Sequence, residues 1–250
     1  AMKQHVKSFT PPELSDGFKS VVCVPSFGAS KELVARMSPA AKLLKFPRTS
    51  HLLNLGAATR DDLISGDVTV SDNARVMVTE KVDGANLGFS LSFDLQILVQ
   101  NRSHFVMPSS HSQFRKLGRF VECHRRALIS VLHRDETYAE RYVLYGEWMA
   151  ATHSIPYNRL PKIFLAFDLY DRLTTSFLDR ESVARVLEGT GIPMVPLISV
   201  RRTMPTRLEL ETYVKQPSMF ADGPVEGVYI KIEEGGVVLQ RTKVIRANFI

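Results

Sequence analysis

The sequence predicts an α+β fold in which antiparallel sheets are flanked by a few helices. Short apolar runs, several of them with the two-residue alternation of strands, recur along the whole second half of the chain and part of the first. Longer segments with apolar residues at helical spacing lie between some of these runs. Because the strands come in groups and do not alternate strictly with helices, an antiparallel arrangement is favoured over a doubly wound parallel sheet.

Seven strands are expected, and each is a run of apolar residues bounded by polar, Gly or Pro residues. Their predicted ranges are 75–82, 86–92, 95–100, 141–145, 163–169, 227–232 and 237–243. In the run 163–169, strict alternation puts Ile163, Leu165, Phe167 and Leu169 on one face and Phe164, Ala166 and Asp168 on the other.

Three helices are expected between the strands. The longest covers 112–133, where apolar residues share one face at Phe114, Leu117, Val121, Leu128, Val131 and Leu132. Shorter helices are predicted over 180–187, ended by Gly189, and over 206–214. The absence of repeats or linkers indicates one domain over 1–250.

Composition favours an intracellular, soluble protein of the cytoplasm or nucleus. Only Cys23 and Cys123 are present, which is too few for a disulfide framework or a zinc site. Residues 1–17 lack the apolar core of a secretion signal, and no run has the length of a membrane span. The 32 basic against 26 acidic residues give a net charge of +6, which suits a nucleic acid or nucleotide partner but equally an ordinary basic protein.

The segment most informative about chemistry is TEKVDGAN, residues 79–86. Lys81 lies at the end of a predicted strand, from which its side chain can reach a bound ligand. An amine that attacks phosphorus must be uncharged, which requires a pKa lowered by burial or by neighbouring cations. Gly84 allows the backbone to approach a nucleotide closely. When this short string is taken alone, a lysine in a solvated turn is the commoner explanation.

Five further segments follow in a fixed order. They are QNRS at 100–103, YGEW at 145–148, FLAFDL at 164–169, EGVYIK at 226–231 and RTK at 241–243. Together with the Lys81 segment, this order resembles the nucleotidyltransferase motifs I, Ia, III, IIIa, IV and V of polynucleotide ligases and mRNA capping enzymes, which implies their ATP-grasp-like domain. The residues around Lys81, and the absence of an OB-type domain before the sequence stops at Ile250, resemble RNA ligases of the RNA ligase 2 type. A further C-terminal domain after 250 stays open.

The resemblance assigns roles to residues in the first four segments. Lys81 is implied to be the nucleophile on the α-phosphate of ATP. Glu80 resembles a residue that holds adenine, although a solvated carboxylate is an equal explanation. Arg102 is implied to contact ribose or phosphate, and Asn86 either contacts the nucleotide or caps a turn. Glu147 resembles a ribose-binding carboxylate, and its burial would require a ligand or cation partner.

The remaining segments supply an aromatic residue, a carboxylate and three cations. Phe167 resembles the residue that stacks on adenine, although it shares a face with core aliphatic residues. Glu226 is implied, with Glu147, to organise Mg²⁺ or Mn²⁺. Lys231 falls on the opposite face from Glu226 in an unbroken strand, so either the chain bends at Gly227 or Lys231 is a surface residue.

The last motif places two cations on one face. Arg241 and Lys243 are expected to neutralise phosphates and to lower the pKa of Lys81. Arg241 stands where related enzymes usually have lysine, so its role is open. The site is expected to bring Lys81 near Glu147 and Glu226.

The resemblance implies an ATP-dependent RNA ligase that joins 5′-phosphate and 3′-hydroxyl RNA ends through lysyl-AMP and an adenylylated RNA end; a nicked duplex, a single-stranded end and a broken tRNA stay open as substrates. A monomer is expected. A DNA ligase, a GTP-dependent capping guanylyltransferase, or a non-catalytic nucleotide- or RNA-binding module are the alternatives.

Three other segments are weaker candidates for contact with the substrate. Residues 45–51 can guard the triphosphate or the RNA end, and the segment 153–157 either touches nucleic acid or is a plain loop. The basic residues of the predicted helix 112–133 form either a phosphate-tracking face or a solvated surface.

Overall fold

Two five-stranded sheets form the frame of the molecule. The structure is a computed structural model of the chain, and it describes residues 26, 43–56, 68–135, 138–247 and 249. The first sheet has the strand order β1-β10-β9-β2-β8 and the second has the order β4-β3-β5-β6-β7. All strand pairs are antiparallel except β1 with β10, which confirms the predicted α+β class.

The first sheet is built from β2 (Arg75–Lys81), β8 (Leu197–Arg201), β9 (Gly227–Glu234), β10 (Val237–Ile245) and the short β1 (Ser50–His51). One of its faces is apolar. There Val78, Ile230 and Val244 pack with residues of α5 (Arg207–Tyr213), a helix that starts with a capping box at Thr206. The alternate residues of β2, β9 and β10 face the second sheet.

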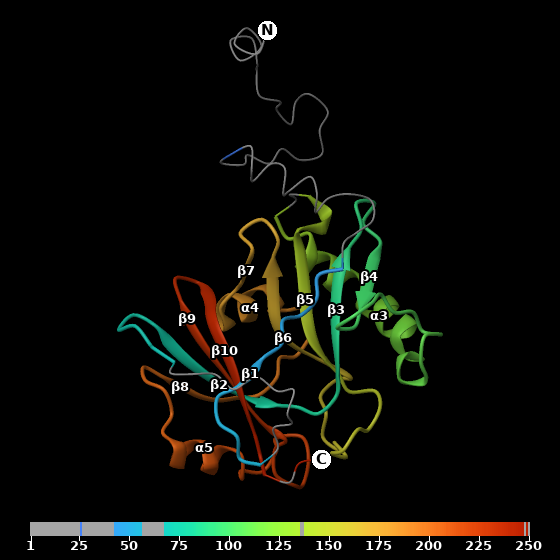
Figure 1. Cartoon of the computed structure of the whole chain (residues 1–250). Helices are drawn as coiled ribbons and strands as arrows, with labels where there is room; N and C mark the ends of the chain where they lie inside the picture. Colours follow the sequence, from blue (N-terminus) through green and yellow to red (C-terminus); the bar gives the residue numbers. More distant parts are fainter. Residues whose placement is uncertain (1–25, 27–42, 57–67, 136–137, 248, 250) are drawn as a thin grey trace, which may run out of the picture.

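The second sheet consists of β3 (Ala85–Leu91), β4 (Ile97–Gln100), β5 (Tyr142–Trp148), β6 (Phe164–Asp171) and β7 (Ser176–Phe177). Its outer face carries the largest apolar cluster, which includes Phe89, Leu144 and Phe164. Helix α3 (Leu117–Leu132) covers this face, as Figure 1 shows, and α4 (Arg180–Leu187) packs beside β6. The residues between, on β3, β5 and β6, turn the other way, toward the first sheet.

A β-bulge interrupts β6 at Phe167. Tyr145 of β5 pairs with Asp168 and Gly146 pairs with Ala166, so Phe167 is the extra residue. Phe167 and Asp168 consequently both face the first sheet, while Leu169 joins the outer cluster with Phe164 and Ala166. The predicted face assignment of Asp168 and Leu169 is therefore wrong, because strict alternation does not survive the bulge.

A segment that precedes the first sheet crosses between the two sheets. We call residues 43–51 the strap; it ends in β1, which pairs with β10 (Figure 1). The carbonyl oxygen of Leu44 accepts hydrogen bonds from Gln100 Nε2 and Tyr145 Oη, each at 2.6 Å. Phe46 is 5% exposed and packs edge-on against Tyr145, Phe167 and Phe177. The strap thus connects the two sheets.

Each of the seven predicted strands exists, with ends that differ by up to three residues. The predicted helix 180–187 matches α4, and 206–214 extends α5 by one residue at each end. The predicted helix 112–133 divides into a 3-10 turn at Ser112–Phe114 and α3. The strands β1, β7 and β8 were not predicted, because they are short or lie at a sheet edge. None of the helices in the described ranges has the length and apolar character that a membrane crossing requires. Residues 1–17 and Cys23 lie outside the described residues.

Candidate active site

Lys81 lies at the end of β2 on the face that meets the second sheet. Its Nζ atom is 2.5 Å from Glu226 Oε1, and its side chain is 19% exposed. The Tyr229 ring centroid is 5.9 Å from the same Nζ. Glu226 immediately precedes β9, so the alternation of that strand does not fix its direction. A lysine and a mostly buried carboxylate are therefore paired where the two sheets meet.

The charge of Lys81 is stabilised in this arrangement. Burial works to lower the pKa of Lys81, but Glu226, Tyr229 and Glu147 outweigh it and the pKa is raised above the ordinary lysine value. The expectation that Arg241 and Lys243 lower this pKa is wrong for the protein without ligand. The physical reason is that anionic groups lie nearer to the amine than either cation does.

Glu147 contributes the second carboxylate from the opposite sheet. Burial raises the pKa of Glu147 to about 7, and the positive charge of Lys81 only partly opposes this. Glu147 stands directly across from Asn86 on β3. Asn86 Oδ1 is buried and accepts no hydrogen bond from the described residues. The turn-capping interpretation of Asn86 is therefore wrong, since Asn86 lies within a strand.

Gly84 is required for close packing at this point. A Cβ atom at Gly84 would lie 2.7 Å from the carbonyl oxygen of Trp148 and 3.0 Å from Cγ of Glu147. Gly227 is equally restricted, because a Cβ there would lie 2.2 Å from the carbonyl oxygen of Val244. Gly227 is the register partner of Lys81, so it brings backbone close to this lysine, and Gly84 does the same for Glu147.

Glu80 has a different environment from its neighbour Lys81. It is 2% exposed and accepts hydrogen bonds from Ser218 Oγ at 2.5 Å and from the Met219 N–H at 3.1 Å. Burial raises the pKa of Glu80 despite these two bonds. The solvated-carboxylate interpretation is wrong. Glu80 holds the 218–220 turn beside the site.

The cations Lys231 and Arg241 share one buried carboxylate. Lys231 Nζ is 2.7 Å from Asp168 Oδ1, and Arg241 Nη1 is 2.7 Å from Asp168 Oδ2. Lys231 Nζ also donates to the Phe167 carbonyl oxygen at 2.7 Å. We call Asp168, Lys231 and Arg241 the inter-sheet triad. Lys231 is 5% exposed, so the surface interpretation is wrong, and no bend within β9 is needed because Glu226 lies outside the strand.

Arg241 also packs between two aromatic rings. Its guanidinium carbon lies 4.9 Å from the Phe46 centroid and 4.0 Å from the Phe177 centroid. Phe46 belongs to the strap, whereas Phe177 belongs to the second sheet. Arg241 therefore links the other members of the triad to the strap and to the edge of the second sheet.

Lys243 and Phe167 complete the predicted set on this face. Lys243 lies across from Tyr229 and close enough to Glu226 to favour its charged form. Phe167 is half-buried, and its ring packs against Phe46 at 5.3 Å. Lys243 and Phe167 both lie between the two sheets, on the same side of the first sheet as Lys81.

Arg102 is the predicted residue that the structure does not tie to the others. It is exposed in the turn after β4, where Asn101 Oδ1 accepts from the backbone of Ser103 and His104. Among the described residues, Arg102 forms no ion pair and has no contact with Lys81. In the 153–157 segment, Asp83 Oδ2 accepts from the N–H of Ser154 and Ile155.

Two neighbours of the site were not predicted, and two more lie in the segments 45–51 and 153–157, which were only weaker candidates. For Asp168 only a position on a strand face was predicted, and Tyr229 was only part of the 226–231 motif without a predicted role. Tyr157 Oη accepts a hydrogen bond from the Asp83 N–H at 2.8 Å, and Phe46 enters from the strap. A motif position could have indicated Asp168 and Tyr229, but only tertiary structure brings Phe46 onto Arg241 and Tyr157 to the backbone of Asp83.

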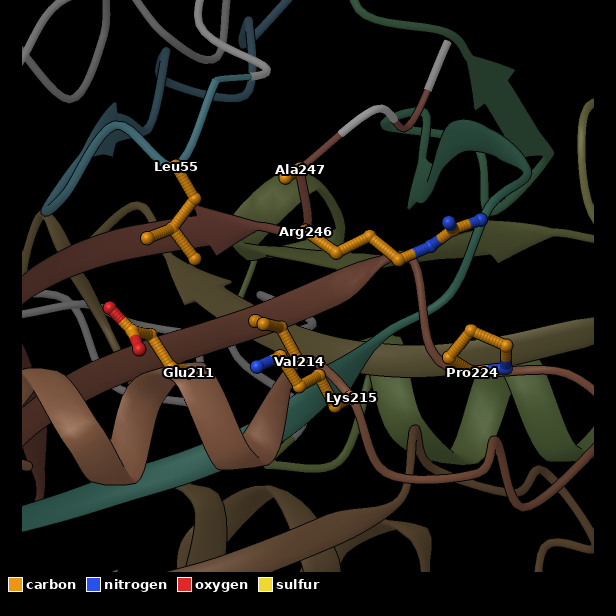
Figure 2. A pocket seen from close by; sticks show the side chains of 7 residues that line it. All are labelled: Leu55, Glu211, Val214, Lys215, Pro224, Arg246 and Ala247. Atoms are coloured by element: carbon orange, nitrogen blue, oxygen red, sulfur yellow. The ribbon is translucent and has the colours of Figure 1, made fainter.

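A separate depression of about 400 Å³ lies on the α5 side of the first sheet. Figure 2 shows Leu55, Val214 and Arg246 around the same space, with Glu211 and Lys215 on the helix side. None of its lining residues belongs to the predicted site. Lys81 and the inter-sheet triad therefore lie on the opposite face of this sheet.

The two sheets, with the motif lysine and carboxylates between them, identify the chain as a nucleotidyltransferase domain of the ligase type. The sequence model of the RNA ligase family matches residues 74–245, and the chain belongs to this family. No match is found among curated proteins.

Solved structures of a Naegleria gruberi RNA ligase share the fold. A lysine-to-alanine mutant with ATP and Mn has a TM-score of 0.55 at 18% identity, covering 70% of this chain and 50% of that one. A glutamate-to-alanine mutant with AMP and Mn gives 0.56 at 16% identity, covering 82% and 56%. The enzyme with PPi gives 0.53 at 22% identity, covering 70% and 50%. The chain thus spans about half the length of these structures.

Proposed function

We propose that this chain is the adenylylating domain of an ATP-dependent RNA ligase, with Lys81 as the residue that becomes covalently attached to AMP. The observation that carries the proposal is the position of Lys81 between Glu226 and Glu147, on the face shared with Lys243. Membership of the RNA ligase family, and the ATP, AMP and PPi in the structures of similar fold, support this choice.

The first step requires Lys81 to lose a proton. Glu226 Oε1 lies 2.5 Å from Nζ and is the nearest acceptor for it. Burial raises the pKa of Glu226, which makes it a better base than an exposed glutamate. The free amine then forms a bond to the α-phosphorus, the bond from that phosphorus to the bridging oxygen breaks, and pyrophosphate leaves with the electron pair.

The two later steps follow the same chemistry at an RNA end. A 5′-phosphate oxygen attacks the phosphorus of lysyl-AMP, and the amine leaves with a proton restored to it. A 3′-hydroxyl then attacks the activated 5′-phosphate, and AMP leaves. Positioning and charge neutralisation dominate such reactions, which agrees with a site that has several cations and few acid-base groups.

The carboxylates fit a divalent metal ion. Glu226 Oε2 is buried without a hydrogen-bond partner among the described residues, and Glu147 faces the same space. No group of three or more potential ligands occurs in the described ranges, and Mg²⁺ or Mn²⁺ held by two carboxylates and water needs no such group. Glu147 and Glu226 would hold the ion, which would supply Lewis-acid charge neutralisation at the phosphates.

The other residues have proposed binding roles. Lys243 would contact phosphate oxygens, as would Lys231 and Arg241 once the phosphates compete with Asp168 for these two cations. Phe167 would stack on adenine, and Glu80, through the 218–220 turn, would shape the adenine pocket. Asn86 would donate or accept at the nucleotide, and Arg102 would contact it from the turn after β4.

The test is transfer of label from α-labelled ATP to protein with Mg²⁺ or Mn²⁺. We expect a labelled adduct that is lost in acid, as a phosphorus–nitrogen bond is, and that Lys81→Ala cannot form. Lys215→Ala, at an exposed lysine on the other side of the first sheet, serves as the control and should keep the label. Labelling of the Lys81→Ala protein would refute the assignment.

Further arms separate the alternatives. Labelling from GTP would indicate a capping guanylyltransferase, and sealing of nicked DNA but not RNA would indicate a DNA ligase. ATP binding without any adduct would indicate a binding module. The proposed domain organisation is a single nucleotidyltransferase domain, and RNA ends are its proposed partners.

A further inference from the structure

A basic groove lies on the outer side of the second sheet, away from Lys81. It has a volume of about 480 Å³ and is formed by α3 and by the segment that leads into β6. Lys116, Arg119 and Lys162 are its fully charged lining residues, and no acidic residue lines it. All three are exposed, and none forms an ion pair within the described parts of the chain. Their charges are therefore available to a polyanion.

The floor of the groove is apolar and aromatic. Phe120 is 5% exposed and belongs to the outer cluster of the second sheet. The ring of His124 stacks on it at 4.2 Å, and Leu160 and Ile163 lie beside them. The partly exposed His124 ring, held in place on Phe120, lies with the exposed cations in one groove, and single-stranded nucleic acids use this combination because phosphates contact the cations and a base can pack on the ring.

The groove is connected to the reactive lysine through the loop between β5 and β6. Leu160 lines the groove and also packs on the cluster that contains Val82, the residue after Lys81. Within the same loop, Tyr157 binds the backbone of Asp83. A single RNA strand that leaves the Lys81 site would therefore reach the groove by passing over the loop between β5 and β6.

We propose that the groove binds the sugar–phosphate backbone of the RNA substrate, away from the reacting ends. The identity of the polyanion rests on the proposed function, whereas the position of the groove does not. The cations of α3 that face the groove would then be a phosphate-binding surface and not only a solvated helix face. This assigns to Lys116, Arg119 and Lys162 a role separate from the chemistry at Lys81.

The first test measures salt dependence. The triple variant Lys116→Gln, Arg119→Gln and Lys162→Gln is compared with the wild type for binding of a 5′-phosphorylated single-stranded oligoribonucleotide. Each phosphate contact with a single strand adds about 0.7 to the slope of log K against log salt, so the slope should fall by about 2. Labelling by ATP should stay at the wild-type level, because none of the three contacts the Lys81 site.

The matched control removes the same charge elsewhere. Arg185, Arg202 and Lys215 are exposed and lie outside the groove, and their change to Gln should leave the slope near that of the wild type. An equal fall in both triple variants would show that only net charge matters, and would overturn the proposal.

The second test places the RNA directly. Cys123 is an exposed free cysteine that lines the groove. In a Cys23→Ser background, its alkylation should slow as the oligoribonucleotide is added, and the slowing should be lost in the groove variant. If Cys123 stays unprotected and the slope is unchanged while lysyl-AMP forms, the groove proposal fails and the proposed function stands. If Cys123 is protected but no lysyl-AMP forms, the proposed function fails and the groove remains an RNA site.

Discussion

Neutralising the buried carboxylate of Asp168, which lies between the two sheets, should strongly destabilise the fold. Asp168 is 1% exposed and pairs with both Lys231 and Arg241, whose side chains are 6% and 11% exposed. Asp168→Asn keeps the size of the side chain but leaves two buried cations without a counter-charge. Removing one member of a buried ion pair costs about 3–5 kcal/mol.

The cost should be visible in unfolding experiments. For a domain of this size, 1 kcal/mol corresponds to about 2–4 °C, so Tm should fall by about 6–20 °C. Urea titration followed by circular dichroism gives the free energy of unfolding directly. Asp222→Asn is the control, because Asp222 pairs with Arg159 at the exposed surface and should matter little. A loss below about 1 kcal/mol for Asp168→Asn would refute the view that the inter-sheet triad joins the sheets.

Three further outcomes are expected. The pKa of Glu147 and of Glu233 is raised to about 7 by burial, so the folded protein binds more protons than the unfolded chain between pH 4.5 and 7. Stability should therefore fall as pH rises through this window, and the fall should shrink in Glu233→Gln; a flat urea midpoint would contradict it. Glu226→Gln removes the nearest anion from Lys81, so the pKa of Lys81 should drop. Label transfer should become slower, but its rate should rise with pH at a lower pH than in the wild type. An unshifted pH profile would count against Glu226 as the partner of Lys81. Phe46→Ala should lower the free energy of unfolding by about 3–5 kcal/mol, measured in urea, and a value near zero would mean that the strap does not join the two sheets.

Sequence alone predicts those parts of the molecule that depend on local pattern. The seven strands follow from apolar runs, and α4 follows from its apolar spacing and the Gly189 boundary. Lys81, Glu147 and Glu226 follow from motif order, and the structure brings them together. The predicted proximity of these three residues is confirmed, because Lys81 and Glu147 lie at or next to the ends of strands that their own sequences define and Glu226 directly precedes another strand.

Other parts depend on contacts between distant segments. The direction of Asp168 could not be predicted, because the extra residue at Phe167 shifts the alternation of β6. The position of Lys231 was left open because Glu226 was treated as part of the same strand. The pKa of Lys81 was predicted in the wrong direction because Glu226 and Glu147 act on this amine, while Arg241 is paired with Asp168 and packed between two rings.

The bulge in β6 gives one strand two adjacent functions. By turning Phe167 and Asp168 toward the same side, it lets a flat ring and a negative charge stand next to each other, which a regular pleat forbids. Deleting either residue would restore the regular pleat, and the strand would then present only the ring or only the charge on this side. The length of this strand, counted in residues, is thus as constrained as the identity of any side chain on it, and variants of this domain should tolerate substitution at 167 better than deletion.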